Sequence, residues 1–246
     1  MDKSTPAQAQ KWWEEGVIYQ IYPLTYADGN QDGTGDLRGI IKRLDYLNDG
    51  DPNSSTSLGI DAIWLSPINK SPMVDNGYDI ADYQDVCPTF GSLEDFDELL
   101  NKAHQRGIYF ILDLVVYHTS NHHPWFLESC SSQENPKADW YLWQTPFEGQ
   151  ALPNNWQSYF GGTGWTYCEP REQFFYLTFN ENLPDLNWKN PDVRAAVYSI
   201  VRFWLDRGVD GFRLDASSVY SKDPYFLDKP LIYDSTDKYL YNNYHL

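Results

Sequence analysis

The chain has 246 residues and a formal net charge of −17, because 35 Asp and Glu residues outnumber 18 Lys and Arg residues. Hydrophobic residues make up 41% of the chain and aromatic residues 17%, which excludes intrinsic disorder. The acidic balance argues against a nucleic-acid partner, because lysine and arginine bind phosphate backbones. No apolar run reaches the roughly 18 residues of a membrane span. The polar residues 1–10 carry no secretion signal, so a cytoplasmic protein is expected.

Three cysteines, Cys87, Cys130 and Cys168, stand at wide spacing along the chain. An odd number at such spacing fits neither a disulfide framework nor a zinc-binding pattern. All three are therefore predicted to be ordinary thiols.

Hydrophobic periodicity divides most of the chain into alternating strands and helices. Runs of β-branched and aromatic residues predict four strands, at residues 16–23, 60–65, 108–116 and 209–215. A helical period with capping residues predicts three helices, at residues 37–48, 93–105 and 191–207. Residues 118–186 are irregular, which indicates a small folded excursion after the third strand. The alternation predicts parallel strands joined by right-handed crossovers.

Chemistry-bearing side chains follow these strands, and active sites of parallel α/β folds lie at the carboxyl ends of the strands. We therefore expect Asp75, Tyr78, His118, Arg213 and Asp215 to converge on one pocket. Arg213 and Asp215 are two residues apart and point to the same side of a strand. The guanidinium would keep the carboxylate ionised, as a glycosidic nucleophile requires. A purely structural salt bridge is the alternative interpretation of this pair.

The acidic, glycine-rich loop that follows the first strand predicts a hard-cation site. Oxygen ligands alternate at Asp28, Asn30 and Asp32, and Asp36 adds a fourth. The loop resembles the start of an EF-hand, but its twelfth position is Gly39 and the segment before it reads as a strand. We therefore expect a calcium site, with magnesium as the alternative ion, that is not an EF-hand. A solvated turn is the competing interpretation.

Together these segments resemble the α-amylase superfamily of glycoside hydrolases, and within it the oligo-1,6-glucosidase and α-glucosidase branch. The matching segments are residues 16–23, 35–37, 63–67, 75–83, 113–118, 183–187 and 211–215. The resemblance implies an α/β fold, an incomplete TIM (β/α)₈ barrel holding about the first four β/α units. A small irregular subdomain would be inserted after the third strand. The implied domains are residues 1–117, 118–186 and 187–246, the last truncated after the fourth strand.

The resemblance also implies a role for each residue of the predicted pocket. Asp215 resembles the catalytic nucleophile, and Arg213 would hold its carboxylate ionised. Asp75 and His118 resemble hydrogen-bonding partners of the glucose ring, and Tyr78 resembles its stacking platform. In the acidic loop, the carbonyl of Thr34 would join the four side chains as a calcium ligand. The implied reaction is retaining hydrolysis of terminal α-glucosidic bonds in small oligosaccharides.

Four departures from the family pattern matter. Tyr117 stands where the family has asparagine, and its role there is open. Leu183 stands where the branch usually has glutamine, so the usual substrate specificity of the branch is less well supported. The resemblance at Ala216 favours α-1,4 over α-1,6 linkages, because small residues at this position accompany α-1,4 linkages in the branch. The segment at residues 49–57 is longer than in many relatives. No fifth strand ending in glutamate follows Asp215, so the chain is expected to carry the nucleophile without the general acid and to be inactive alone.

Other readings stay open at this point. A sucrose- or trehalose-converting transferase or isomerase of the same superfamily would use the same nucleophile with another acceptor. An inactive remnant that keeps partial sugar binding would also fit the missing acid. A metal-dependent barrel enzyme that uses the Asp28 loop for catalysis is disfavoured, because no base stands beside that loop. The sequence does not predict an oligomeric state.

Overall fold

The computed structural model describes residues 11–233 and 239–241, so the localisation prediction drawn from residues 1–10 lies outside the described part. The chain forms two compact units. Unit 1 comprises Met1–Ser66, Thr89–Leu112 and Arg207–Arg213, and unit 2 comprises Pro67–Pro88, Asp113–Asp206 and Leu214–Leu246. The predicted domain boundaries at residues 117 and 186 stay a prediction.

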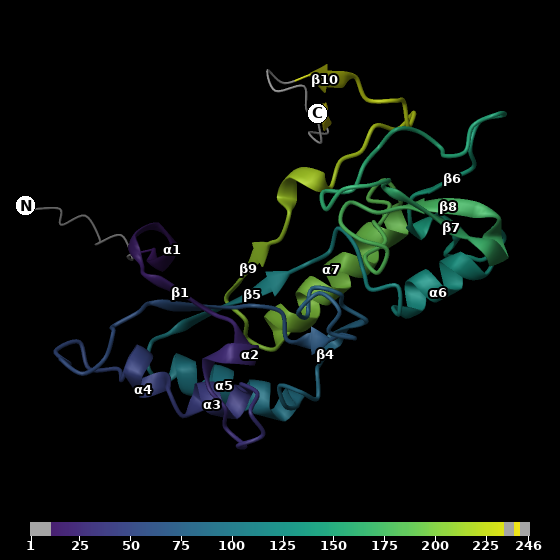
Figure 1. Ribbon diagram of the computed structural model, residues 1–246. Helices are drawn as coiled ribbons and strands as arrows, with labels where there is room; N and C mark the ends of the chain where they lie inside the picture. The colour runs from purple at the N-terminus through teal and green to yellow at the C-terminus, as the bar shows by residue number, and fades with distance from the viewer. Residues whose placement is uncertain (1–10, 234–238, 242–246) are drawn as a thin grey trace, which may run out of the picture. The chain divides into compact units, whose positions relative to one another are not determined.

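The main sheet has four strands in the order β1, β2, β5 and β9 (Figure 1). Their bounds are β1 (Ile18–Ile21), β2 (Ala62–Leu65), β5 (Tyr109–Leu114) and β9 (Gly211–Leu214). β2 pairs in parallel with β1 on one side and with β5 on the other. The predicted parallel sheet is thus confirmed. Five of the six residues of β5 are buried, as expected of a strand covered on both faces.

The described residues of unit 1 form five helices: α1 (Trp12–Glu15), α2 (Pro23–Tyr26), α3 (Leu37–Ile41), α4 (Leu44–Leu47) and α5 (Leu93–His104). α5 confirms the prediction for residues 93–105, and its N-terminus carries a capping box between Ser92 and Asp95. The prediction of one continuous helix at residues 37–48 is wrong, because the structure has two short helices there, α3 and α4. At Arg43 the amide bonds back only three residues, to the carbonyl of Ile40, which separates α3 from α4. Figure 1 shows α3, α4 and α5 together on one side of the strands.

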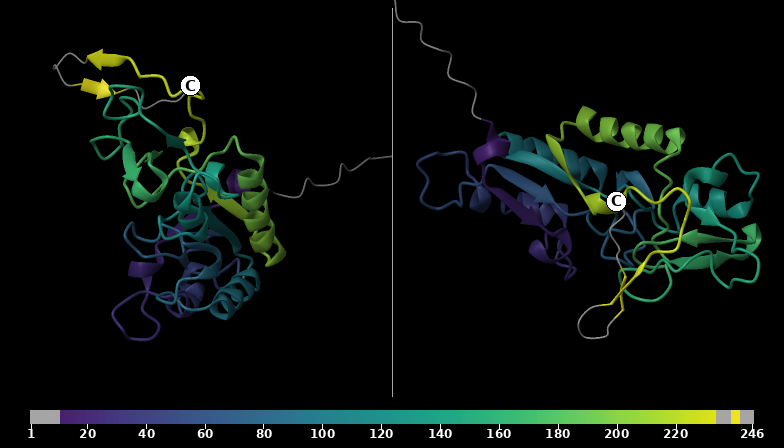
Figure 2. Two further views of the ribbon diagram at one scale, coloured as in Figure 1. Left: turned by 90° about the vertical axis from the view of Figure 1, so that its right-hand side faces the viewer. Right: turned by 90° about the horizontal axis from the view of Figure 1, so that it is seen from above.

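Unit 2 contains a long helix and several short elements. They are β3 (Asn69–Lys70), β4 (Asp82–Val86), α7 (Pro191–Asp206), the 3₁₀ helix η3 (Ser217–Val219), β10 (Leu231–Tyr233) and β11 (Tyr239–Tyr241). Figure 2 shows α7 as one unbroken helix. It buries Val193, Val197, Ile200 and Trp204 on one face, as the helical period predicts. The pairs β3–β4 and β10–β11 are antiparallel and were not predicted.

The irregular segment 118–186 folds into a helix and a small antiparallel sheet. Its elements are α6 (Pro124–Ser131), η1 (Ala138–Trp140), β6 (Trp143–Gln144), β7 (Trp165–Cys168), η2 (Glu169–Arg171) and β8 (Gln173–Tyr176). The strand order is β6, β8, β7. Aromatic side chains supply its core. The ring centroids of Phe126 and Phe175 are 5.0 Å apart, and those of Trp156 and Tyr176 are 5.2 Å apart. This composition explains why hydrophobic periodicity did not reveal the strands.

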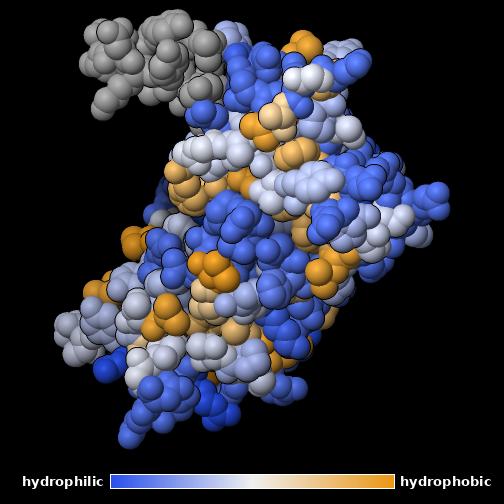
Figure 3. All heavy atoms as spheres, turned by 45° about the vertical axis from the view of Figure 1, so that its right-hand side comes forward, coloured by the Kyte–Doolittle hydropathy of each residue, from blue (hydrophilic) through white to orange (hydrophobic). Residues whose placement is uncertain are grey.

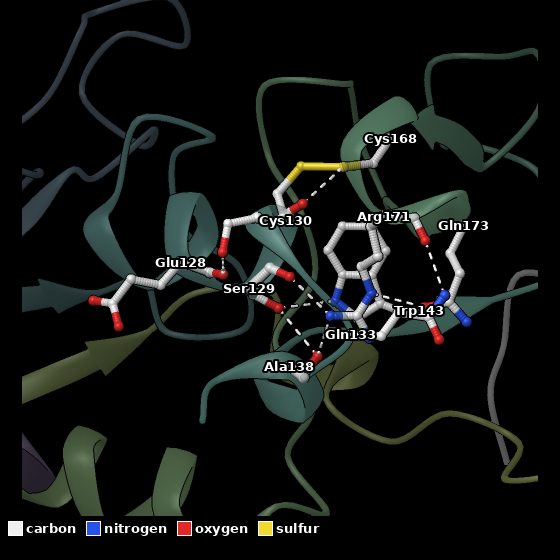
Figure 4. Close-up of a disulfide and its surroundings, with 10 residues drawn as sticks. Glu128, Ser129, Cys130, Gln133, Ala138, Trp143, Cys168, Arg171 and Gln173 are labelled. Carbon is white, nitrogen blue, oxygen red and sulfur yellow. Dashed lines mark hydrogen bonds between the residues drawn. A yellow bond between two sulfur atoms is a disulfide. The ribbon is translucent and has the colours of Figure 1, made fainter. Parts of the chain in front are cut away.

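The prediction that all three cysteines are ordinary thiols is wrong for two of them. Cys130 in α6 and Cys168 at the end of β7 form a disulfide across 38 residues, as Figure 4 shows. Their spacing gave no signal, because the pairing depends on how the excursion folds. Arg171 supports the same region: its guanidinium donates to the carbonyls of Ser129 and Ala138 and lies over the ring of Trp143. Cys87 is a buried free thiol.

The visible surface in Figure 3 is mostly hydrophilic, and its hydrophobic side chains are scattered in small groups. This agrees with the acidic composition, since excess carboxylates are accommodated as solvated side chains. No described helix combines the length and the apolar composition that crossing a membrane demands.

Candidate active site

Asp75 lies in unit 2, in the loop between β3 and β4, and Asp79 shapes that loop. The carboxylate of Asp79 is completely buried and accepts hydrogen bonds from the Ser71 hydroxyl and from the amides of Val74 and Asp75. The Asp75 side chain itself is half-buried. Burial, then the charge of Asp79 and then that of Asp215, raises the pKa of Asp75. The charges of Asp75 and Asp215 therefore interact within this unit.

Tyr78 belongs to the same loop and reaches the end of β5. Its hydroxyl donates to Oδ2 of Asp113 at 3.1 Å, and Asp113 is buried. This hydrogen bond fixes the ring of Tyr78, which a stacking platform requires. Asp113 lies on β5 and thus positions Tyr78.

Asp215 follows β9 directly, as predicted for a residue at the carboxyl end of a strand. Its amide donates to the carbonyl of Leu114 at 3.2 Å, and this hydrogen bond holds the backbone of Asp215 beside the last residue of β5. The next residue, Ala216, has a left-handed backbone with φ of 44°. A non-glycine residue in that region costs about 1 kcal/mol or more, and such strain clusters at functional sites. Ala216 turns the chain abruptly from β9 into η3.

His118 and Tyr117 lie just beyond β5 and are both buried. Burial and, less strongly, the charge of Lys222 lower the pKa of His118 to about 3. Neither ring nitrogen of His118 has a hydrogen-bond partner within the described residues. Tyr117 packs edge-on against His118 with ring centroids 4.2 Å apart. Burial first, and then the charges of Asp215, Asp185 and Asp75, raise the pKa of Tyr117, so its ring lies among the candidate site residues.

Arg213, the remaining predicted pocket residue, belongs to unit 1. It lies on β9, and its guanidinium stands over the ring of Trp64 on β2 at 4.8 Å. The predicted role of Arg213 in keeping Asp215 ionised stays a prediction. Unit 2 thus brings Asp75, Tyr78, His118 and Asp215 within one fold unit.

A buried ion pair that no sequence pattern predicts lies in unit 2 beside His118. Lys222 and Asp185 approach to 2.9 Å, and their side chains are only 6% and 1% exposed. Thr178 donates its amide and its hydroxyl to the Asp185 carboxylate. Asp185 also pairs with His118 through an isolated antiparallel bridge. No sequence signal marked Lys222, because the two charged residues are 37 positions apart, as their numbers show.

The acidic loop is a tight turn of unit 1 built on its own carboxylates. Asp28 accepts hydrogen bonds from the amides of Asn30, Gln31 and Gly33, and these bonds, Gly33 first, lower its pKa. Asn30 donates its side-chain amide to Asp32 at 2.9 Å. Asp36 instead caps α3 through the amide of Gly39. Carboxylate and amide oxygens suit a hard cation, although the described residues hold no group of three or more His, Cys, Asp or Glu that could bind a metal ion.

Three comparisons relate the chain to known proteins. Oligo-1,6-glucosidase of Parageobacillus thermoglucosidasius is 50% identical over 213 residues, covering 87% of this chain and 36% of that protein. Alpha-glucosidase MAL32 of Saccharomyces cerevisiae is 48% identical over 245 residues, covering 97% of this chain and 40% of that protein. The crystal structure of an α-glucosyl transfer enzyme superposes with a TM-score of 0.85 at 52% identity, covering 91% of this chain and 40% of that enzyme's chain. The chain thus spans about two-fifths of the length of these proteins.

The model of the alpha-amylase catalytic domain matches residues 20–244. This range holds every residue of the predicted pocket and the whole acidic loop. The fold of these neighbours is of the TIM-barrel type, and the parallel sheet of this chain agrees with it. The chain belongs to the alpha-amylase family of catalytic domains.

Proposed function

We propose that this chain carries the nucleophile and part of the glucose-binding site of a retaining α-glucosidase, acting on terminal α-glucosidic bonds of small oligosaccharides. The observation that carries the proposal is the position of Asp215. It leaves the carboxyl end of β9, and Asp75 and Tyr117 lie within its electrostatic reach. Relatives named oligo-1,6-glucosidase and alpha-glucosidase support the reaction class.

The proposed chemistry has two displacements. The Asp215 carboxylate attacks the anomeric carbon, the bond to the leaving oxygen breaks, and a glucosyl ester forms. Water then attacks that ester, releases glucose with retained configuration and regenerates the carboxylate. The leaving oxygen needs a proton from a second carboxyl group about 5–5.5 Å from the nucleophile. We propose that this acid comes from outside the 246 residues, which leaves the isolated chain without turnover.

His118 and Tyr78 supply the proposed contacts with the sugar ring. A buried polar group without a partner is costly, and both ring nitrogens of His118 are in that position within the described residues. His118 is 1% exposed, so a sugar hydroxyl would bind one of them once the side chains around the ring move aside. The lowered pKa keeps His118 neutral, so one nitrogen donates and the other accepts. Tyr78, held by Asp113, presents a fixed ring face, and Asp75 would bind ring hydroxyls.

Two supporting roles complete the proposal. Arg213 would stabilise the ionised form of Asp215, and calcium would bind the turn formed by Asp28, Asn30, Asp32, the Thr34 carbonyl and Asp36. Bound calcium would supply a structural cross-link and no catalytic step. Magnesium is the alternative, although its demand for octahedral geometry suits a flexible, oxygen-rich loop less well.

A glucosyl transferase is the second candidate, favoured by the likeness to an α-glucosyl transfer enzyme. The first displacement would be the same, and a sugar hydroxyl would replace water in the second. Ala216 and the residues after it follow the nucleophile, where an acceptor would approach. The two candidates differ in products: hydrolysis of maltose by the whole protein yields glucose alone, while transfer yields longer saccharides.

A trapped intermediate tests the nucleophile directly. The probe is 5-fluoro-α-glucosyl fluoride, whose fluoride leaves without help from an acid and whose ring fluorine slows the second step. Incubation with the chain is expected to add one fluoroglucosyl group to the peptide that contains Asp215, as seen by mass spectrometry. Asp215→Asn should stay unlabelled, and Asp223→Asn is the matched control that should label normally. Labelling of another carboxylate, or none, would overturn the assignment.

A further inference from the structure

Unit 2 contains a cavity that none of the proposed catalytic residues lines. Its volume is about 460 Å³, within the range of small-molecule sites. Three segments of the chain form its walls, residues 139–143, 186–189 and 220–226. All three belong to unit 2, so the cavity is defined within one compact unit.

Aromatic side chains make up much of the wall, and their rings are fixed by contacts outside the cavity. The four that matter most are Trp143, Trp188, Tyr220 and Phe226. Trp188 donates its indole N–H to the carbonyl of Val116 at 2.9 Å and meets Tyr220 with ring centroids 4.9 Å apart. Rigid aromatic walls lower the entropy cost of binding, because they are already ordered before a ligand arrives.

The segment 220–226 is held in place over this cavity by bonds to the rest of unit 2. Lys222 is anchored on Asp185, and the side-chain amide of Asn154 donates to the carbonyl of Phe226 at 3.0 Å. The indole N–H of Trp156 donates to the carbonyl of Leu227 at 2.8 Å. These bonds hold the segment 220–226 in one position, so the shape of the cavity is fixed by the fold of unit 2.

Polar groups of mixed charge complete the lining and indicate the ligand class. They are Asp139, Asn187, Lys189 and Asp223, while the ammonium of Lys222 is neutralised by Asp185. The carboxylate of Asp223 accepts from the amides of Tyr225 and Leu227, and the lining holds one other aspartate and one other lysine, so neither an anion nor a strong cation is favoured. Hydrogen-bonding groups beside aromatic faces suit a neutral ring with an apolar face and several hydroxyls.

We infer that this cavity is a second saccharide-binding site, which takes a neutral di- or trisaccharide such as maltose or maltotriose. The ligand class rests on the proposed function, but the site uses other residues than the catalytic ones. An occupant would contact residues 139–143 and 220–226 together. Binding would therefore stabilise unit 2 as well as hold the sugar.

Calorimetric titration of the 246-residue chain with maltotriose tests the proposal. Ser221→Phe places a bulky ring at an exposed position of the lining and is expected to abolish the binding heat of this site. Asp139→Ala removes an exposed carboxylate while its carbonyl still accepts from Asn187, and should weaken binding about fivefold, as the loss of one hydrogen bond does. Asp75→Ala removes any heat that arises at the proposed catalytic site and should leave the part of the heat that Ser221→Phe removes. Unaltered melting temperatures of the variants show that they fold.

The two proposals fail in different ways. Binding that survives Ser221→Phe and disappears in Asp75→Ala would place the sugar at the proposed catalytic site alone and overturn the second site. Absence of any maltotriose binding to the folded wild-type chain would overturn it as well. Loss of fluoroglucosyl labelling with maltotriose binding intact would refute only the nucleophile assignment.

Discussion

Asp75 and Asp215 lie close enough together for the negative charge of Asp215 to raise the pKa of Asp75, after the larger effects of burial and of Asp79. A carboxyl group with a raised pKa stabilises the fold below its unfolded pKa of 3.8, and this stabilisation is lost as the pH rises through the folded value. At neutral pH the ionised Asp75 therefore lowers stability. Such a cost is typical of functional sites, where binding is favoured over stability.

The substitution Asp75→Asn should therefore raise the melting temperature at pH 7. The gain in unfolding free energy is expected to stay below about 1 kcal/mol, because the half-exposed side chain is screened by solvent. It should vanish near pH 3, where Asp75 is protonated. Thermal unfolding at both pH values measures it, with the exposed Asp139→Asn as control. A lower melting temperature for Asp75→Asn at pH 7 would contradict the argument.

The Lys222–Asp185 pair is expected to be a strong determinant of stability. Removing one partner of a buried ion pair leaves an uncompensated charge, which costs about 3–5 kcal/mol. Lys222→Met should show a loss of this size in urea unfolding. Adding Asp185→Asn to that variant should recover part of it, because the amide removes the charge and still accepts from Thr178. Lys102→Met, from an exposed pair with Glu98, should lose only about 0.3–0.5 kcal/mol.

Local signals predicted the fold better than the site. Ser92 and Asp95 are three residues apart, so the capping box that starts α5 can be recognised in the sequence. The apolar run of β5 likewise indicates a buried strand. Lys222 and Asp185, or Cys130 and Cys168, meet only after residues 118–186 have folded, and no periodicity encodes such contacts. Asp215 could be found because it directly follows β9, and Asp75 and His118 because they stand in loops after apolar runs, whereas Lys222 follows η3.

Reduction of the disulfide should destabilise the excursion. A cross-link that closes a loop of 38 residues restricts the unfolded chain by about 4 kcal/mol in the loop-entropy account. The double variant Cys130→Ser, Cys168→Ser should lose stability of this order in urea unfolding. Dithiothreitol should destabilise the wild type similarly and leave the double variant unaffected. Equal stability of the two proteins without reductant would show that the cysteines are not paired in solution.

Buried histidines should make the fold sensitive to acid. Burial lowers the pKa of both His118 and His123 to about 3, while the unfolded value is 6.5. The unfolded chain thus binds more protons between these values, and stability present above pH 6.5 is lost as the pH falls towards 3. Each histidine should cost about 2 kcal/mol on going from pH 7 to pH 5.

His123→Asn provides the measurement for this effect. Asparagine keeps an acceptor for the amide of Trp125, which Nδ1 of His123 now binds, while it removes the titration. The difference in unfolding free energy between pH 7 and pH 5 should shrink by about 2 kcal/mol in this variant. The exposed neighbour serves as control, and His122→Gln should keep the pH dependence of the wild type. An unchanged dependence in His123→Asn would mean that His123 titrates normally.

Calcium is expected to stabilise unit 1 through the acidic loop. An ion that binds only the folded state adds about 2.7 kcal/mol at a concentration one hundred times its dissociation constant. The melting temperature should therefore rise with calcium, and rise less with magnesium. Asp32→Ala should remove the response, because it deletes one of the proposed ligands. Asp51→Ala changes another exposed turn, where Asp51 accepts from the amide of Asn53, and should respond to calcium as the wild type does. An equal rise of the melting temperature in Asp32→Ala would place the ion elsewhere. No rise in the wild type would mean that the loop binds no calcium and is a turn stabilised by hydrogen bonds from its own amides to Asp28.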